Sequence, residues 1–230
     1  MTRTAIDEFR ERLASRWVPS FSAARAHRDF APEGFRWETA TRLKEYDARW
    51  FLAAVDAGLV TESGGFFVAA MSPHTEQLFW SGSKSESPRT FTLWLEPIIT
   101  IGALARLHFD HGWPADRLGC QSKGSGLDLV GYDPADNWVL GGEVKNTQRE
   151  LDALIVDMAR FAADPGLTRP ENQRLRNAFM KVVSIRKNKP STFWAIAAEG
   201  YSRAFRVVRL DGAGRFALQK TPAARLDPEA

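Results

Sequence analysis

The chain has 230 residues, of which 44% are hydrophobic and 26% are charged, and its net charge is +3. This length and balance are typical of one sizeable globular domain, or of a compact domain with a smaller appendage, and exclude disorder over most of the chain. No run of about 18 apolar residues is present, which excludes a transmembrane helix.

The N-terminal sequence and the cysteine content favour a cytoplasmic protein. Residues 1–17 are charged and amphipathic, without the apolar run and small-residue cleavage site of a secretory signal. The single cysteine, Cys120, cannot form an internal disulfide, which fits a reducing compartment. We therefore expect a cytoplasmic location.

Basic residues concentrate in the C-terminal part of the chain. Residues 169–220 contain twelve Lys and Arg against three Asp and Glu, so the rest of the chain is net negative. A basic segment on a mildly acidic body often contacts a polyanion such as nucleic acid. A solvated basic face that keeps the protein in solution explains the charge equally well.

Residues 1–60 are predicted to be mainly helical. One helical spacing covers the first 17 residues, and a second runs from about Thr39 to Val55 and ends at Gly58. Residues 59–71 then predict a hairpin that turns at Gly64-Gly65. Helices followed by a hairpin occur in winged-helix DNA-binding units. A structural cap is the preferred interpretation, because no recognition helix stands out by its charge.

A small, polar, proline-containing stretch at 81–90 is the best candidate for a linker. It divides the chain into an N-terminal helical region with a hairpin, 1–85, and a second domain, 86–230. The second domain begins with an apolar segment, 92–111, in which Pro97 fits the first turn of a helix. Glu96 therefore lies near the start of that helix.

The rest of the chain predicts a mixed α/β core, that is, a mixed β-sheet flanked by helices. An apolar stripe at helical spacing marks one amphipathic helix, and a basic stretch follows it. The predicted strands are 127–132, 138–145, 193–198, 204–210 and 215–220, and the predicted helices are 151–162 and 171–186.

Three charged residues form the pattern that indicates chemistry. Asp128 lies in an apolar strand, and Glu143 and Lys145 end the next one. Residues two apart on a strand project to the same face, so Glu143 and Lys145 lie together and Val144 points to the other side. If the two strands form a hairpin, Asp128 comes alongside this pair.

Such a cluster suits phosphodiester hydrolysis. Burying ionised groups costs several kcal/mol unless partners or a metal compensate. Two carboxylates offer hard oxygen ligands for Mg²⁺ or Mn²⁺, which can bind a phosphate oxygen and acidify the attacking water. A neighbouring lysine can orient or deprotonate that water, or stabilise charge on the phosphate.

Asp128 followed by Glu143-Val144-Lys145 resembles the D-(x)n-E-x-K signature of the PD-(D/E)xK, or restriction-endonuclease-like, nuclease superfamily. Residues 95–113 look like the first core helix of that family, which often carries a glutamate near its start, here Glu96. The layout is similar to the Mrr-like branch, and the resemblance covers roughly residues 90–165. The Pro-Asp of the signature is replaced by Leu127-Asp128.

The resemblance implies a restriction-endonuclease-like core and a role for each residue. Asp128 and Glu143 would ligate the metal with the backbone carbonyl of Val144, Lys145 would assist catalysis, and Glu96 would be an auxiliary ligand. A chance cluster of charges is the competing interpretation, because the pattern is short. A glutamate that only complements the helix dipole explains Glu96 nearly as well.

Further residues are candidates for substrate contacts. Gln148 follows the motif and is either a substrate contact or a first-turn helix residue. Lys123 lies in a polar, glycine-rich loop that either approaches a phosphate backbone or only turns the chain. The basic candidates for phosphate contacts are Arg174, Arg176, Lys181, Arg186, Lys187 and Lys189.

The sequence thus predicts a metal-dependent nuclease that acts on nucleic acid, DNA rather than RNA, in defence against foreign DNA or in repair. The rival hypothesis is a non-catalytic nucleic-acid-binding or regulatory protein on a nuclease-like scaffold. A third is a subunit that needs a partner protein or a homodimer, since many nucleases cut two strands with two copies of one site.

Overall fold

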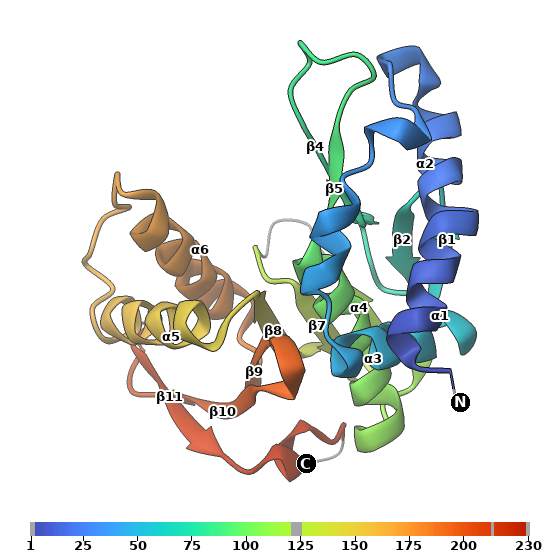
Figure 1. Cartoon of the computed structure of the whole chain (residues 1–230). Coiled ribbons are helices and arrows are strands. Elements are labelled where there is room, and N and C mark those ends of the chain that lie inside the picture. Colours follow the sequence, from blue (N-terminus) through green and yellow to red (C-terminus); the bar gives the residue numbers. More distant parts are fainter. Residues whose placement is uncertain (1–2, 121–125, 213, 229–230) are drawn as a thin grey trace.

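The computed structural model of the chain describes residues 3–120, 126–212 and 214–228. Its largest unit is a six-stranded mixed β-sheet with helices on both faces, and a mainly helical N-terminal region lies beside it (Figure 1). The mixed α/β class that the sequence predicts is confirmed.

The sheet is built from β6 (Leu118–Cys120), β7 (Leu129–Tyr132), β8 (Trp138–Lys145), β9 (Thr192–Ala197), β10 (Ser202–Arg209) and β11 (Phe216–Thr221). Its order is β11-β10-β9-β8-β7-β6, with β8 and β9 parallel and the other neighbours antiparallel. Parallel neighbours need a long crossover. Here it consists of two helices, α5 (Gln148–Ala163) and α6 (Gln173–Asn188).

Strand β9 shows how the two faces of the sheet are covered. Phe193, Ala195 and Ala197 belong to the apolar cluster of α5 and α6. Trp194 and Ile196 belong to the cluster that contains α4 (Leu95–His111). Because successive side chains of a strand point to opposite faces, the single apolar run of β9 packs against the helices on both faces of the sheet.

The N-terminal region starts with a long helical segment: α1 (Ala5–Arg12), a π-helical turn η1 (Leu13–Trp17) and α2 (Val18–Ala24). The second predicted helix is divided into a 3₁₀ segment and α3 (Glu45–Asp56), because Leu43 and Lys44 are extended. Gly58 follows α3 with φ 68°. The 3₁₀ segments are η2 (Ala26–Arg28), η3 (Pro32–Gly34), η4 (Trp37–Arg42), η5 (Ala115–Arg117), η6 (Ala198–Gly200) and η7 (Ala223–Leu226).

Two small sheets follow. β1 (Val60–Ser63), β2 (Phe66–Ala69) and β3 (Glu76–Gln77) form an antiparallel sheet, and the predicted hairpin at Gly64-Gly65 is confirmed. β4 (Phe79–Ser81) pairs with β5 (Phe91–Leu93). The interpretation of 81–90 as a linker is therefore wrong, because residues 82–90 close this hairpin.

One apolar core joins the N-terminal region to the sheet. The same cluster contains Phe9 and Trp17 of the first helical segment, Phe51 of α3, Ile98 of α4 and Trp194 of β9. Helix α3 packs against α1 and also against α4. This packing favours the cap interpretation, whereas the division at residue 85 stays a prediction.

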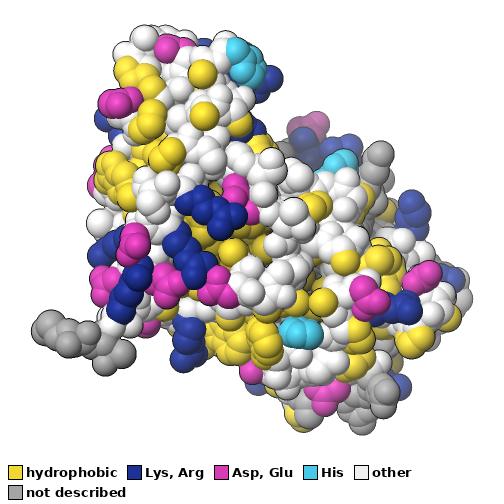
Figure 2. Space-filling model, turned by 90° about the vertical axis from the view of Figure 1, so that its right-hand side faces the viewer, with side chains coloured by type: hydrophobic (Ala, Val, Ile, Leu, Met, Phe, Trp, Pro, Cys, Tyr) yellow, Lys and Arg dark blue, Asp and Glu magenta, His cyan; other side chains and the backbone are white. Residues whose placement is uncertain are grey.

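Figure 2 views the molecule from the side on which α1 and α2 lie in Figure 1. On this face Lys and Arg side chains lie next to Asp and Glu side chains and do not form a continuous basic surface. Arg12 pairs with Glu8 and Asp56, and Arg16 pairs with Glu62. The face therefore offers little uniform attraction to a polyanion.

Among the helices of the described ranges, none combines the length and the apolar character that crossing a bilayer requires.

Candidate active site

Asp128 and the end of β8 are brought together by the β7–β8 pairing. Leu129 pairs with Gly142, and the N–H of Asp128 extends this pairing by donating to the carbonyl of Gly142 at 3.0 Å. The Oδ2 of Asp128 accepts the N–H of Val144 at 2.8 Å. Asp128 directly precedes β7, one residue outside the strand in which the sequence placed it.

Glu143 and Lys145 project to one face of β8, as their spacing predicts. Lys145 Nζ lies 2.9 Å from Glu143 Oε1, while Val144 packs in the core on the other side. Helix α6 covers the Glu143 face and contributes a second cation, because Lys181 Nζ lies 2.7 Å from Glu143 Oε2. Each oxygen of this carboxylate therefore faces a different ammonium group.

Glu143 is the most deeply buried acid of the cluster, with 1% of its surface exposed. Burial raises its pKa to about 7, and the charge of Asp128 adds to this effect, while Lys181 and Lys145 oppose it. Removing a carboxylate from water is costly without compensating charge. The two lysines supply that compensation.

Lys145 is surrounded by acceptors. Besides Glu143, its ammonium contacts the carbonyl of Val144 at 2.6 Å and lies 3.8 Å from Glu96 Oε1. Burial lowers its pKa, but the attraction of Glu143, Asp128 and Glu96 is larger, and the net pKa lies above the usual lysine value. Lys145 is therefore protonated at neutral pH.

Glu96 lies in the first turn of α4, as the sequence predicts. Burial raises its pKa, Lys145 opposes the shift, and the charge of Asp128 adds to it. Glu96 thus shares the electrostatic environment of the other two carboxylates. Its position also complements the positive end of the helix dipole, so both interpretations of this residue stay open.

The chemistry of the donor set fits a small divalent cation. Over the described ranges 3–120, 126–212 and 214–228, no group of three or more His, Cys, Asp or Glu side chains is arranged to hold a metal ion. Mg²⁺, however, is commonly bound through one or two carboxylates and keeps several waters. Asp128 and Glu143 provide such a pair. The carbonyl of Val144 accepts Lys145, so its role as a ligand stays a prediction.

A cavity of about 600 Å³ borders this cluster. It is lined by residues from α4, β8, α5 and α6, among them Glu96, Lys145, Arg149 and Arg174. This volume lies in the range of ordinary ligand sites. Its lining includes three cations, Lys145, Arg149 and Arg174, which can attract a negatively charged ligand.

Helix α6 carries two of the predicted phosphate contacts, Arg174 at this cavity and Lys181 at the carboxylate of Glu143. Arg174 lines it, and although the guanidinium pairs with Asp157 at 2.8 Å and 3.1 Å, its side chain is 69% exposed. Lys181 lies deeper, on Glu143, and its side chain is only 13% exposed. Lys181 therefore contacts the carboxylate of Glu143, whereas a phosphate contact was expected to face the solvent.

The other candidates are distributed differently. Gln148 is exposed in the first turn of α5, next to Thr147 of the cavity wall, and its amide lies 3.5 Å from Asp152. Arg186 donates to the carbonyls of Gly214 and Ala162, outside the lining of this cavity, so its assignment as a phosphate contact stays a prediction. Lys187 and Lys189 lie at the C-terminal end of α6, outside the lining of the cavity, and Lys123 lies outside the described residues.

Sequence reasoning missed the contact between Lys181 and Glu143, although a signal for it exists. Ala178 and Ile185 are buried residues of α6, and Lys181 lies three and four positions from them on the same stripe. A lysine on the apolar face of a helix needs a buried partner. Glu143 is that partner.

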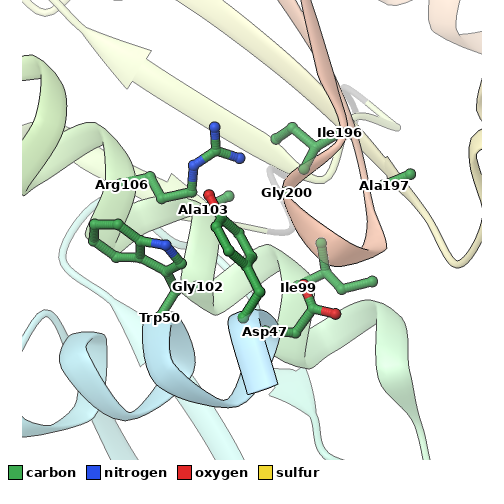
Figure 3. Close-up of a pocket in the computed structure, with 10 residues that line it drawn as sticks. Asp47, Trp50, Ile99, Gly102, Ala103, Arg106, Ile196, Ala197 and Gly200 are labelled. Carbon is green, nitrogen blue, oxygen red and sulfur yellow. The ribbon is translucent and has the colours of Figure 1, made fainter. Parts of the chain in front are cut away.

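A second cavity, which none of these carboxylates lines, lies between α3, α4 and the β9–β10 connection (Figure 3). The Arg106 guanidinium lies there 4.8 Å from the ring centroid of Trp194. Within the described structure, Arg106 Nε and Trp50 Nε1 are buried without a hydrogen-bond partner. The cavity measures about 10 Å³ and has room for about one water molecule, so we regard it as structural.

Comparison of the chain with protein-family models, with curated proteins and with solved structures found no match. The chemistry of the cluster is therefore argued from its geometry.

Proposed function

We propose that the chain is a metal-dependent nuclease that hydrolyses phosphodiester bonds, with Mg²⁺ or Mn²⁺ as cofactor and DNA as the expected substrate. The observation that carries this proposal is the convergence of Asp128, Glu143 and Lys145 at the adjoining ends of β7 and β8. Burying charged groups in this way is unfavourable for stability, so a chemical role is a good reason for the cluster.

Each residue of the cluster would have a distinct chemical role. Asp128 and Glu143 would hold the cation, which supplies charge neutralisation at the phosphate and acidification of a bound water. Lys145 would donate hydrogen bonds and stabilise the negative charge that develops on the phosphate oxygens, or orient or deprotonate the attacking water. Water would attack phosphorus and lose a proton to the solvent, the bond to the leaving oxygen would break, and that oxygen would take up a proton from the solvent.

The restriction-endonuclease-like core belongs to the same proposal. Helix α4, with Glu96 in its first turn, precedes β7 and β8 along the chain, which is the layout that the D-(x)n-E-x-K resemblance implies. A role in defence against foreign DNA or in repair, and a homodimer or partner protein that supplies a second site, follow from that resemblance alone.

The test is cleavage by the purified protein of linear and circular duplex DNA, single-stranded DNA and RNA, with Mg²⁺, Mn²⁺ or EDTA. Lys145→Ala and Asp128→Ala are expected to lower the rate by at least about 100-fold, the usual effect of losing one group that acts on the reacting centre. Lys84→Ala serves as control, because Lys84 is exposed in the β4–β5 loop.

Cutting that survives both active-site substitutions would disprove this assignment. If no substrate is cut but nucleic acid binds with strong salt dependence, the non-catalytic scaffold replaces the nuclease as the best hypothesis.

A further inference from the structure

Lys181 is held inside the candidate active site by contacts of its ammonium group. It lies 2.7 Å from Glu143 Oε2 and also donates to the carbonyl of Gly126. The side chain is 13% exposed, and its ammonium group lies directly beside the carboxylate of Glu143.

The contact involves the same atoms that the proposed cofactor would use. Glu143 Oε1 faces Lys145, and Oε2 faces Lys181. A cation that binds an oxygen of Glu143 would therefore compete with the ammonium group that faces this oxygen. Lys145 retains the Val144 carbonyl and Glu96 as acceptors, whereas Lys181 retains only the carbonyl of Gly126 among its hydrogen-bond and ion-pair partners in the described chain.

We infer that Lys181 is an internal counter-ion that competes with the divalent cation for Glu143, an inference that rests on the proposed metal-dependent function. Before the cation binds, Lys181 neutralises Glu143 and holds it in place. When the cation takes over this role, the ammonium is released next to the cavity and becomes available to a substrate phosphate. Lys181 is thus a positioning residue that weakens metal binding.

The direct test is the affinity for Mn²⁺, measured by calorimetry without substrate. Lys181→Met removes the charge and keeps most of the side-chain volume, so Mn²⁺ is expected to bind roughly tenfold more tightly, within the usual range of coupling between two sites. Lys181→Arg keeps the charge and is expected to restore affinity close to that of the wild type. Lys84→Met, which removes an exposed lysine from the β4–β5 loop, is the control.

The outcomes separate this inference from the proposed function. Asp128→Asn identifies the binding site, because removing the negative charge of Asp128 should weaken the same Mn²⁺ binding. If the wild type binds no Mn²⁺ that depends on Asp128, the proposed function fails. If it binds Mn²⁺ but Lys181→Met leaves the affinity unchanged or weaker, with the fold intact by circular dichroism, only the counter-ion inference fails.

A measurement on the unmodified protein covers the case in which Lys181→Met does not fold. The Lys181 ammonium group can be followed by ¹⁵N NMR during titration with Mg²⁺, after assignment by Lys181→Arg. The inference requires that its signal changes with the same saturation curve as metal binding. A signal that stays constant at saturating Mg²⁺ would overturn it.

Discussion

Two buried carboxylates of this chain are compensated in different ways. Glu143 is paired with two lysines at hydrogen-bonding distance. Asp47, which is 5% exposed, accepts the backbone N–H of Glu199 with both oxygens at 3.1 Å. Burial raises the pKa of Asp47 to about 6, although this hydrogen bond opposes the shift and Arg106 attracts the carboxylate. The charge of Glu143 is therefore compensated by two ammonium groups, whereas the carboxylate of Asp47 accepts a backbone hydrogen bond.

The pH dependence of stability tests the assignment of Asp47. A folded-state pKa of about 6, above the ordinary aspartate pKa of 3.8, means that the folded protein binds this proton more tightly than the unfolded chain. The contribution of Asp47 to stability is therefore largest below pH ~4, falls as the pH rises to ~6, and is constant above that. Asp47→Asn keeps an acceptor for Glu199 and should be more stable than the wild type at pH 7, by on the order of 1 kcal/mol.

Thermal unfolding at pH 7 and pH 4 measures this difference, which should nearly vanish at pH 4. Asp47→Ala is the matched variant, since it leaves the N–H of Glu199 without its acceptor and should lose about 1–3 kcal/mol at both pH values. An Asn variant that is less stable than the wild type at pH 7 would show that attraction to Arg106 dominates instead.

At the scale of elements, the capped start of α5 determines the direction of the chain after β8. Thr147 caps this helix: its Oγ1 accepts the N–H of Glu150, and the Glu150 carboxylate accepts the N–H of Thr147. Only Asn146 separates this cap from Lys145. The cap therefore fixes the direction in which the chain leaves the residues of the candidate site.

Thr147→Ala is expected to lower stability by about 1 kcal/mol, the usual effect of losing a helix cap, and to lower nuclease activity as well. Thr4→Ala is the matched control, because Thr4 forms the same capping box at α1, away from the carboxylates. It should lower stability to a similar degree and leave activity unchanged. Equal activity in the two variants would contradict a role of the α5 cap in positioning Lys145.

At the scale of the whole molecule, the N-terminal region and the sheet share one apolar core. Helices α3 and α4 pack closely, since a Cβ atom added at Gly102 would lie 3.1 Å from Trp50 Cβ and 3.3 Å from the backbone N of Phe51. A contact this close couples the two regions, because neither helix can shift without disturbing the other.

We therefore expect a single unfolding transition. Urea curves followed by tryptophan fluorescence and by far-ultraviolet circular dichroism should coincide, as they do in a two-state transition. Gly102→Val should shift both curves together, with a loss of about 1–3 kcal/mol from overpacking. Two separate transitions would instead establish the boundary near residue 85 that the sequence predicts.

The sequence by itself determined most elements and the central pair of the candidate site. Helical spacing predicted α5, while apolar runs, turn residues and a basic helix-like stretch predicted α4, α6 and all strands of the sheet except β6. The spacing of Glu143 and Lys145 placed both on one face of β8. These features depend on the local period of a helix or strand, which a single sequence carries.

Only the tertiary structure decided which surfaces meet. It placed Lys181 on Glu143, directed Arg186 to backbone carbonyls, and joined α3 to α4 in one core. Local pattern shows which face of an element is apolar, but not which distant element covers it, because that depends on packing across the whole chain. For the same physical reason, the sequence predicted the residues of the cluster but not the second lysine that neutralises it.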